Sequence, residues 1–334
     1  MALPAWGLLP HLVRLPLSAA ATLLALNFLL WKSPTRLERA RSKRAGHEVL
    51  VFGRPVTFGD TLLMLLRHWS PPRSKDRFIC VHLELPDGPG PVRISPAAAE
   101  DCDAAVRLSI AYLTNEGRLR RELLFAWSLG CHLASAGLRA IGGYLPPMRV
   151  AAVVLPHLPE RDALLLTRRA ASGGSYNSMW VFPGGVVDAG EAPAAAGARE
   201  LEEETGLSVE PGSLRLLCTY QARNEPLCLT YLMLMYNGEV RGGALRMQRK
   251  EVAQAAFLTR DAVARLLAQE DRGEVDGVTH GAEEGSLVEQ PVPLADLRLA
   301  KDYATSTGPG IGAGHWFAMK EWQRCCPNLC APRL

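Results

Sequence analysis

The sequence predicts an α/β fold, because strand-like and helix-like patterns alternate along its second half. The runs RVAAVVL from Arg149 and ALLLT from Ala163 predict two strands joined by a loop rich in breakers. A helical pattern begins near Pro193, and two apolar strands and a second helix follow before residue 270. The composition agrees with a globular chain, since 48% of the 334 residues are hydrophobic and 21% are charged. We therefore expect a domain in which helices pack on a sheet.

Shifts of composition divide the chain into four predicted regions. Residues 1–44 form a hydrophobic and basic leader, and residues 45–148 form an α/β accessory region whose role the sequence does not indicate. The α/β domain covers residues 149–270, and residues 271–334 hold an acidic loop and a C-terminal helix or tail.

The leader contains an uncharged segment, residues 15–31, which predicts a membrane helix. Its 17 residues would span about 26 Å as a helix, just enough for a thin bilayer. Six of the seven basic side chains of the leader follow this segment, and such a bias places the rest of the chain on the cytoplasmic side. We therefore expect an anchor with its folded domain in the cytoplasm. Mitochondrial or other organelle targeting, and a helix packed on its own domain, remain as alternatives.

The net charge of +3 conceals two regions of opposite sign. Seven basic residues and one acid give residues 1–44 a charge of +6, which leaves −3 for the remainder of the chain. A slightly acidic body is not suited to general binding of a phosphate backbone. No general nucleic-acid binding is therefore expected.

In the accessory region, three segments carry local structural patterns. VLVFGRPVTF alternates like a short strand pair, and residues 61–69 look helical. Residues 123–141 predict a buried or docking helix, in which His132 is read as a core histidine and not as a ligand.

The elements of the α/β domain follow in order. MWVF predicts a short strand closed by Pro183, and the next helix has Pro193 in its first turn and ends near Gly206. Strands LRLLCTYQA and LCLTYLMLMY follow, and then a helix with Thr259 as its N-cap. Residues 271–295 look like a loop, and GPGIGAG (308–314) looks like a flexible linker. HWFAMKEWQ (315–323) has helical apolar spacing and is expected to pack back on the domain.

The segment from Gly184 to Leu207 concentrates acidic side chains on one predicted helix. Its six acids and one base give a local charge of −5. Glu200, Glu203 and Glu204 fall on one helix face, where like charges repel. A hard divalent cation, Mg²⁺ or Mn²⁺, is the natural counter-ion for such carboxylates. The alternative is a solvated acidic face.

Three further residues of this segment carry specific expectations. Arg199 can pair with Glu203 four residues later or reach back to Glu191. Gly184 and Gly185 precede the helix and allow the backbone to approach a phosphate or a metal closely.

These residues match, at every defined position, the Nudix box G-x5-E-x7-R-E-U-x-E-E-x-G-U over Gly185–Leu207, where U is a bulky aliphatic residue. The chain thus resembles the Nudix hydrolase superfamily. The resemblance implies an α/β/α sandwich, with a mixed sheet between helices, and cleavage of a nucleoside diphosphate linked to another moiety.

The resemblance also implies roles for individual residues. Glu200, Glu203 and Glu204 would ligate the metal, and Arg199 with Glu191 would brace the loop–helix–loop that Gly206 closes. The cation and a carboxylate would together promote attack by water. Glu251, in RKEVAQAAFL, stands where members of the superfamily often place an extra acid. An exposed loop acid is the alternative reading of Glu251.

The substrate is less well defined by the sequence. LLTRRA (165–170) and FPGG (182–185) stand at the spacing of the coenzyme A-cleaving branch, but Gly174 and Ser178 depart from its pattern. The moiety X motif 17 type, which hydrolyses capped RNA, is similar in LLTRRA, in the Trp180–Pro183 spacing and in a short C-terminal stretch. A cap or a dinucleotide needs an aromatic side chain for stacking, and Trp180, Tyr176 and Tyr220 are the candidates.

Two classes of function follow from these patterns. The first is a metal-dependent pyrophosphohydrolase for a small nucleotide-type substrate or a capped RNA 5′ end, with a coenzyme A-type diphosphatase as an alternative. The second is a membrane-tethered, non-catalytic nucleotide-binding or regulatory module, suggested by the uninterpreted residues 45–148.

Overall fold

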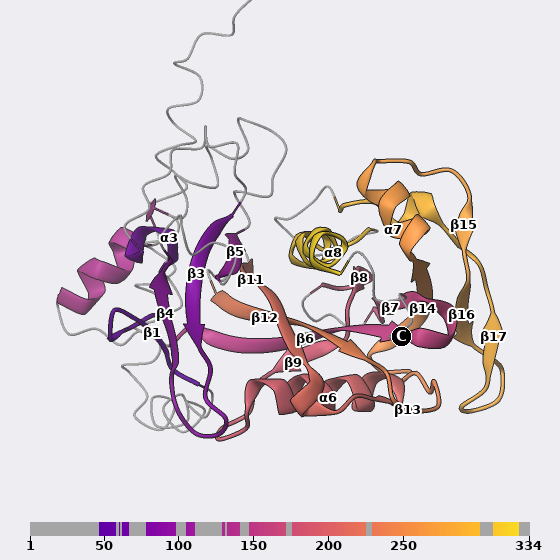
Figure 1. The fold of residues 1–334 in the computed structure, drawn as a ribbon, viewed down its shortest axis with the longest axis horizontal. Coiled ribbons are helices and arrows are strands. Elements are labelled where there is room, and N and C mark those ends of the chain that lie inside the picture. The colour runs from indigo at the N-terminus through magenta and orange to yellow at the C-terminus, as the bar shows by residue number, and fades with distance from the viewer. Residues whose placement is uncertain are drawn as a thin grey trace, which may run out of the picture. The chain divides into compact units, whose positions relative to one another are not determined.

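The computed structural model (Figure 1) describes most of the chain after the leader. The described residues are 47–57, 60, 62–66, 78–97, 105–110, 129–130, 132–140, 147–171, 176–224, 229–300 and 310–326. They fall into two units, which are considered separately. Unit 1 contains the residues up to Val150, with Asp188–Gly190 and Gln221–Leu232, and unit 2 contains the remainder.

Unit 1 contains a small mixed sheet in the order β5-β3-β4-β1-β2. Its strands are β1 (Val49–Val51), β2 (Arg54–Pro55), β3 (Ile79–Glu84), β4 (Val92–Pro96) and β5 (Val106–Ile110). Strands β1 and β2 are antiparallel, as the sequence predicts, and the left-handed residues Phe52 and Gly53 form the turn between them. Strand β1 is parallel to β4, whereas β3 is antiparallel to β4 and β5.

The helices of unit 1 include α3 (Leu62–Leu65) and the stretch 132–140. Both lie inside predicted helices, and the rest of each prediction lies outside the described residues.

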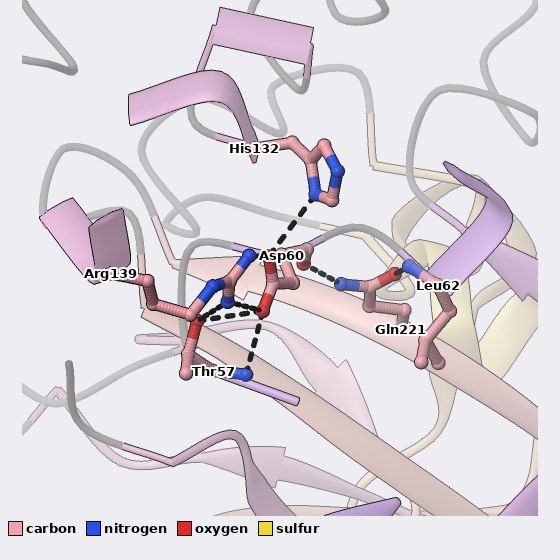
Figure 2. Close-up of polar contacts among 6 residues, drawn as sticks. All are labelled: Thr57, Asp60, Leu62, His132, Arg139 and Gln221. Carbon is pink, nitrogen blue, oxygen red and sulfur yellow. Dashed lines mark hydrogen bonds and ion pairs between the residues drawn. The ribbon is translucent and has the colours of Figure 1, made fainter. Parts of the chain in front are cut away.

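A buried carboxylate, Asp60, joins these parts of unit 1 (Figure 2). Arg139 donates to both of its oxygens, at 2.7 and 3.1 Å, and Nδ1 of His132 lies 3.1 Å from Oδ1. The backbone N–H and hydroxyl of Thr57 donate to Oδ2 at 2.9 and 2.7 Å. The Gln221 side chain donates to the Asp60 carbonyl and accepts from the N–H of Leu62. His132 is therefore half-buried beside a charged partner that the sequence did not indicate.

Unit 2 contains a sheet in the order β17-β16-β14-β7-β6-β12-β11, with β8 added to β7 and β9 to β6. The strands that lie wholly or partly in this unit are β6 (Arg149–Leu158), β7 (Ala163–Arg169), β8 (Trp180–Val181), β9 (Gly184–Val186), β11 (Arg215–Asn224), β12 (Leu229–Glu239), β14 (Val252–Thr259), β16 (Gly277–His280) and β17 (Leu287–Glu289). Two further pairs are β10 (Leu207–Ser208) with β13 (Gly242–Gly243), and β15 (Glu274–Val275) with β18 (Val292–Pro293). The predicted hairpin of β6 and β7 is confirmed.

Helices cover both faces of this sheet (Figure 1). Helix α6 (Pro193–Thr205) lies on one face, where its Leu201 joins Val154, Leu165 and Phe257 in a hydrophobic cluster. Helices α7 (Arg260–Leu267) and α8 (Ala313–Cys325) pack together on the other face. Alternate residues of each strand therefore serve opposite layers of the core. The three predicted helices are confirmed, as is the Thr259 cap, whose hydroxyl accepts from the N–H of Ala262.

The prediction of a loop over 271–295 is wrong, because this segment contains β15 to β18. Strand β16 adds to the edge of β14, with Ala255 opposite Val278. A Cβ on Gly277 would lie 2.9 Å from the Ala255 carbonyl oxygen, so glycine permits the close approach. The strands are too short and too polar to show a period in the sequence.

The prediction of a flexible linker over 308–314 is also wrong for its described part, Gly310–Gly314. These residues are buried, and Ile311 bridges Trp180 and Leu299. Gly310 has a left-handed φ of 110°, and a Cβ there would lie 2.7 Å from the Arg298 carbonyl oxygen. The glycines are therefore required by packing.

Among the described residues, no helix is both long and apolar enough to cross a membrane. The predicted membrane segment, residues 15–31, lies outside the described residues.

Candidate active site

Helix α6 places its acidic side chains at graded depths. The helix starts at Pro193 and ends where Gly206 adopts φ 72° and its N–H bonds to the Glu202 carbonyl. The side chain of Glu204 is only 4% exposed, that of Glu200 is 17% exposed, and that of Glu203 is 55% exposed. The predicted acidic face is therefore not uniformly solvated.

Two glycines bring the backbone against these carboxylates. Gly184 pairs with Val153 of β6, and a Cβ there would lie 2.3 Å from the Ala152 carbonyl oxygen. Gly185 faces Glu200, whose Oε1 would lie 2.3 Å from an added Cβ. The backbone N–H of Gly184 donates a hydrogen bond to Glu204. Glycine at these two positions thus lets the backbone lie close to β6 and to Glu200, where a side chain would clash.

Arg199 holds three carboxylates at once. Its Nε and Nη2 donate to the two oxygens of Glu191 at 2.9 and 3.1 Å, which is a bidentate pair. Its Nη1 donates to Glu200 at 3.0 Å and to Glu203 at 3.3 Å. The hydrogen bonds to Glu191 contribute most to raising the pKa of Arg199. Both partners considered from the sequence, Glu191 and Glu203, are therefore engaged.

Glu204 is a buried acid with incomplete compensation. Burial raises its pKa to about 8, and the negative charges of Glu251 and Glu200 act in the same direction. Arg169, whose Nη1 lies 3.4 Å from Glu204 Oε1, opposes this rise. Burial likewise raises the pKa of Glu200, against the hydrogen bond from Arg199. Raised acid pKa values of this kind concentrate at functional sites.

Glu251 belongs to the same electrostatic neighbourhood. It lies directly before β14, and its carbonyl oxygen accepts from the N–H of Ala170 at 2.8 Å, just beyond the end of β7. Its carboxylate contributes to the raised pKa of Glu200 and of Glu204. The fold therefore brings this half-buried acid to the carboxylates of α6.

The donor set fits a hard divalent cation. The candidate ligands are all carboxylate oxygens, the type that Mg²⁺ and Mn²⁺ prefer. In the part of the chain that the structure describes, no three His, Cys, Asp or Glu side chains form a ready metal cluster. Instead, Arg199 and Arg169 pair with the carboxylates of Glu200, Glu203 and Glu204. A divalent cation would relieve the mutual repulsion of Glu200, Glu204 and Glu251 that these pairs leave.

The aromatic candidates for base stacking are placed differently. Trp180 and Tyr220 are each 2% exposed and belong to the core, so neither ring presents a face to solvent. Tyr176 is half-buried, and its hydroxyl contacts the Met233 sulfur at 3.7 Å. The structure therefore brings the acidic candidates together, but the ring of Trp180 is buried and offers no exposed surface on which a base could stack.

Two polar residues of this region were not identified from the sequence. Arg169 is the second arginine of LLTRRA, and only the pairing of β7 with the neighbouring strands brings it to Glu204. His315 lies in a helix whose packing was predicted, but its Nδ1 accepts from the backbone N–H of Phe182. No local pattern in the sequence signals either contact.

Comparison with known proteins agrees with this geometry. The NUDIX domain family matches residues 147–276 of the chain. A MutT-like protein of Streptomyces ambofaciens is 31% identical, over 37% of this chain and 73% of that protein.

Two vertebrate proteins match a longer part of the chain. They are m7GpppN-mRNA hydrolases NUDT17, of Danio rerio (30% identical) and Xenopus laevis (32% identical). The matches cover 48% and 51% of this chain. The chain thus spans 61% and 63%, or about three fifths, of the length of these two relatives.

Proposed function

Because the chain belongs to the Nudix hydrolase family, we propose that it hydrolyses a diphosphate bond in a compound that joins a nucleoside diphosphate to a second moiety. The observation that carries this proposal is the buried carboxylate of Glu204. It lies beside Glu200 and Arg169, and the N–H of Gly184 donates to it. An acid held at this depth next to other acids is costly unless a cation is recruited to it.

The residues of the site divide the chemistry among them. Glu200, Glu203 and Glu204 would hold a divalent cation, Mg²⁺ or Mn²⁺, which when bound neutralises charge on the phosphate oxygens. Arg199, anchored by Glu191, keeps Glu200 and Glu203 directed at the site. Gly184 and Gly185 give the diphosphate room to approach the backbone.

Glu251 is proposed as the general base. It takes a proton from the attacking water, whose oxygen forms a bond to one phosphorus while the bond from that phosphorus to the bridging oxygen breaks. Two phosphate-bearing products leave, and the proton is returned to solvent.

The 5′ cap of RNA is the first substrate to test. The m7GpppN-mRNA hydrolase relatives support this choice, as does the similarity at LLTRRA and near the C-terminus. A dinucleotide such as NADH is joined by a diphosphate instead of the triphosphate of a cap, but it contains the same type of phosphoanhydride bond and is the second candidate. Coenzyme A is less well supported, because Gly174 and Ser178 depart from that branch's pattern.

The proposal is tested by replacing Glu204 and its exposed neighbour Glu202 separately with Gln. The full chain is assayed with Mg²⁺ or Mn²⁺ against capped RNA, dinucleoside polyphosphates, NADH, ADP-ribose and coenzyme A. We expect Glu204→Gln to lower kcat by at least about a hundredfold, since it removes a carboxylate that would hold the cation, and the cation is what neutralises the charge developing on the phosphate. Glu202→Gln removes the same single negative charge from the helix, and we expect it to leave kcat unchanged. Equal rates in the two variants would contradict the assignment, and nucleotide binding without turnover in the wild type would favour the non-catalytic module.

Binding of Mn²⁺ provides a second readout for the same variants. The proton on Glu204 must leave before a cation can replace it, so the wild-type affinity rises as pH increases toward 8. Glu204→Gln loses this rise, whereas Glu202→Gln retains it. The affinities can be followed by electron paramagnetic resonance of free Mn²⁺.

We also propose that the leader anchors the chain in a membrane with the folded part on the cytoplasmic side. The support is the uncharged segment 15–31 and the six basic residues that follow it. Residues 1–44 fused to a fluorescent protein should remain in membranes after carbonate extraction. A shortened, carbonate-soluble product would instead indicate a cleaved organelle presequence.

A further inference from the structure

The outer edge of β8 is bonded to a segment far along the chain. On one side β8 pairs with β7, through Arg168 opposite Trp180. On the other side the Trp180 N–H donates to the Gly310 carbonyl at 3.0 Å, and the Gly312 N–H donates to the Trp180 carbonyl at 3.2 Å. This segment continues directly into α8.

His315, in the first turn of α8, accepts one further hydrogen bond from the backbone just after β8. The backbone N–H of Phe182 donates to its Nδ1 at 3.1 Å. Because that N–H can only donate, Nδ1 must be the unprotonated nitrogen of the ring. The imidazole is 2% exposed and packs edge-on against Tyr176, with ring centres 5.7 Å apart. Burial first, and then the charge of Arg169, lower its pKa to about 3. The ring is therefore neutral at physiological pH and available as an acceptor.

The bond to His315 lies at the start of the loop that forms the site. Phe182 is followed by Pro183, whose carbonyl accepts from the Val154 N–H at 2.9 Å. Next comes Gly184, whose N–H donates to Glu204. Backbone atoms of these three consecutive residues are thus bonded to α8, to β6 and to α6. If the first bond is lost, a buried N–H is left without a partner, and the loop is held from only two sides.

We propose that His315 is a positioning residue for the active site, through which α8 fixes the backbone of Phe182–Gly185 against Glu204. Helix α8 lies beyond residues 147–276, the part that matches the NUDIX domain family, so the active unit of this chain extends to α8. The effect on turnover rests on the function proposed above. The effect on the loop does not.

The test compares His315→Leu with His315→Asn. These two side chains share one branched shape, but Asn carries Oδ1 where the histidine carries Nδ1, whereas Leu carries a methyl group. We expect His315→Leu to lower kcat about tenfold, equivalent to about 1.4 kcal/mol, with KM changed less than about twofold. His315→Asn restores kcat to within about threefold of the wild type. If His315→Leu does not fold, His315→Gln replaces it, because its acceptor lies one bond further from the backbone.

A matched control is another buried histidine of the same unit, His157. Its Nε2 lies 3.0 Å from Asp162 Oδ1, and neither residue belongs to the site. His157→Asn should lower stability without the kcat effect of His315→Leu. If it lowers kcat as much as His315→Leu does, the effect is a general response to a damaged core and the proposal fails.

Amide hydrogen exchange separates this proposal from the proposed function, since it needs neither metal nor turnover. The Phe182 amide should exchange faster in His315→Leu than in His315→Asn and the wild type. If the wild type cleaves no substrate of the panel, the proposed function fails and the exchange alone decides the role of His315. Equal Phe182 exchange, or equal kcat, in the Leu and Asn variants would overturn the positioning role.

Discussion

The pKa values of two buried carboxylates of this protein are shifted in opposite directions. Burial alone would raise the pKa of Asp60, but the neighbouring imidazole of His132 and hydrogen bonds from Arg139 and Thr57 hold it below its usual range. Burial raises the pKa of Glu204 to about 8, because Arg169 and the Gly184 N–H oppose it only in part. A carboxylate saturated with donors serves the fold, whereas one short of donors can accept a cation.

The saturated carboxylate predicts how stability depends on pH. Since the pKa of Asp60 is lower in the folded than in the unfolded chain, its contribution is complete above about pH 4 and is lost as pH falls further. Asp60→Asn should therefore lower the stability of unit 1 by about 3–5 kcal/mol at pH 7, because Arg139 loses its partner. The difference from the wild type should shrink in acid. Urea unfolding at pH 7 and pH 3 measures both effects.

Asp87→Asn, at an exposed position after β3, is the control. It should leave stability within about 0.5 kcal/mol of the wild type, as surface substitutions usually do. A loss that is the same at both pH values for Asp60→Asn would show that packing, and not charge, is responsible.

At the scale of the element, the position of helix α6 depends on the contacts at its C-terminal end. Gly206 turns the chain with φ 72°, and an added Cβ would lie 2.7 Å from the Ala244 carbonyl oxygen. The Arg246 N–H donates to the backbone carbonyl of Thr205 at 2.7 Å, and the Gln248 N–H donates to the backbone carbonyl of Glu204 at 3.0 Å. The end of the helix and the loop 244–248 are therefore fixed to each other beside Glu204.

Gly206→Ala should be destabilising because it meets both a left-handed backbone and a carbonyl oxygen. We expect a loss of about 1–3 kcal/mol, measured by thermal or urea unfolding. Gly212→Ala is matched, since nothing lies within 4 Å of its added Cβ and its φ is not left-handed. If both variants lost the same stability, the conformation of Gly206 would not be the cause.

For the whole molecule, local patterns predicted most elements but few of the contacts between them. The strands β6 and β7 and the helices α6, α7 and α8 follow from periodicity and caps, which are properties of short segments. Strands β15–β18 and the packed turn at Gly310 depend on distant partners, Ala255 and Arg298 among them, and were missed. The candidate site shows the same contrast between local patterns and contacts between distant residues. The spacing within α6 predicted the acidic face of Glu200, Glu203 and Glu204, whereas the contacts of Arg169 with Glu204 and of His315 with Phe182 arise only through tertiary packing.

The hydrogen bonds between β8 and the segment Gly310–Gly312 have a consequence for the nascent chain during synthesis. The ribosome makes β8 well before Gly310, and at about 5–20 residues per second the delay between them lasts many seconds. Throughout that interval the Trp180 and Phe182 peptide groups lack the partners that later occupy them. An open strand edge invites pairing with other chains. Since the segment that covers this edge and helix α8 are synthesised much later than β8, we expect the nascent chain to depend on chaperone protection until both have packed.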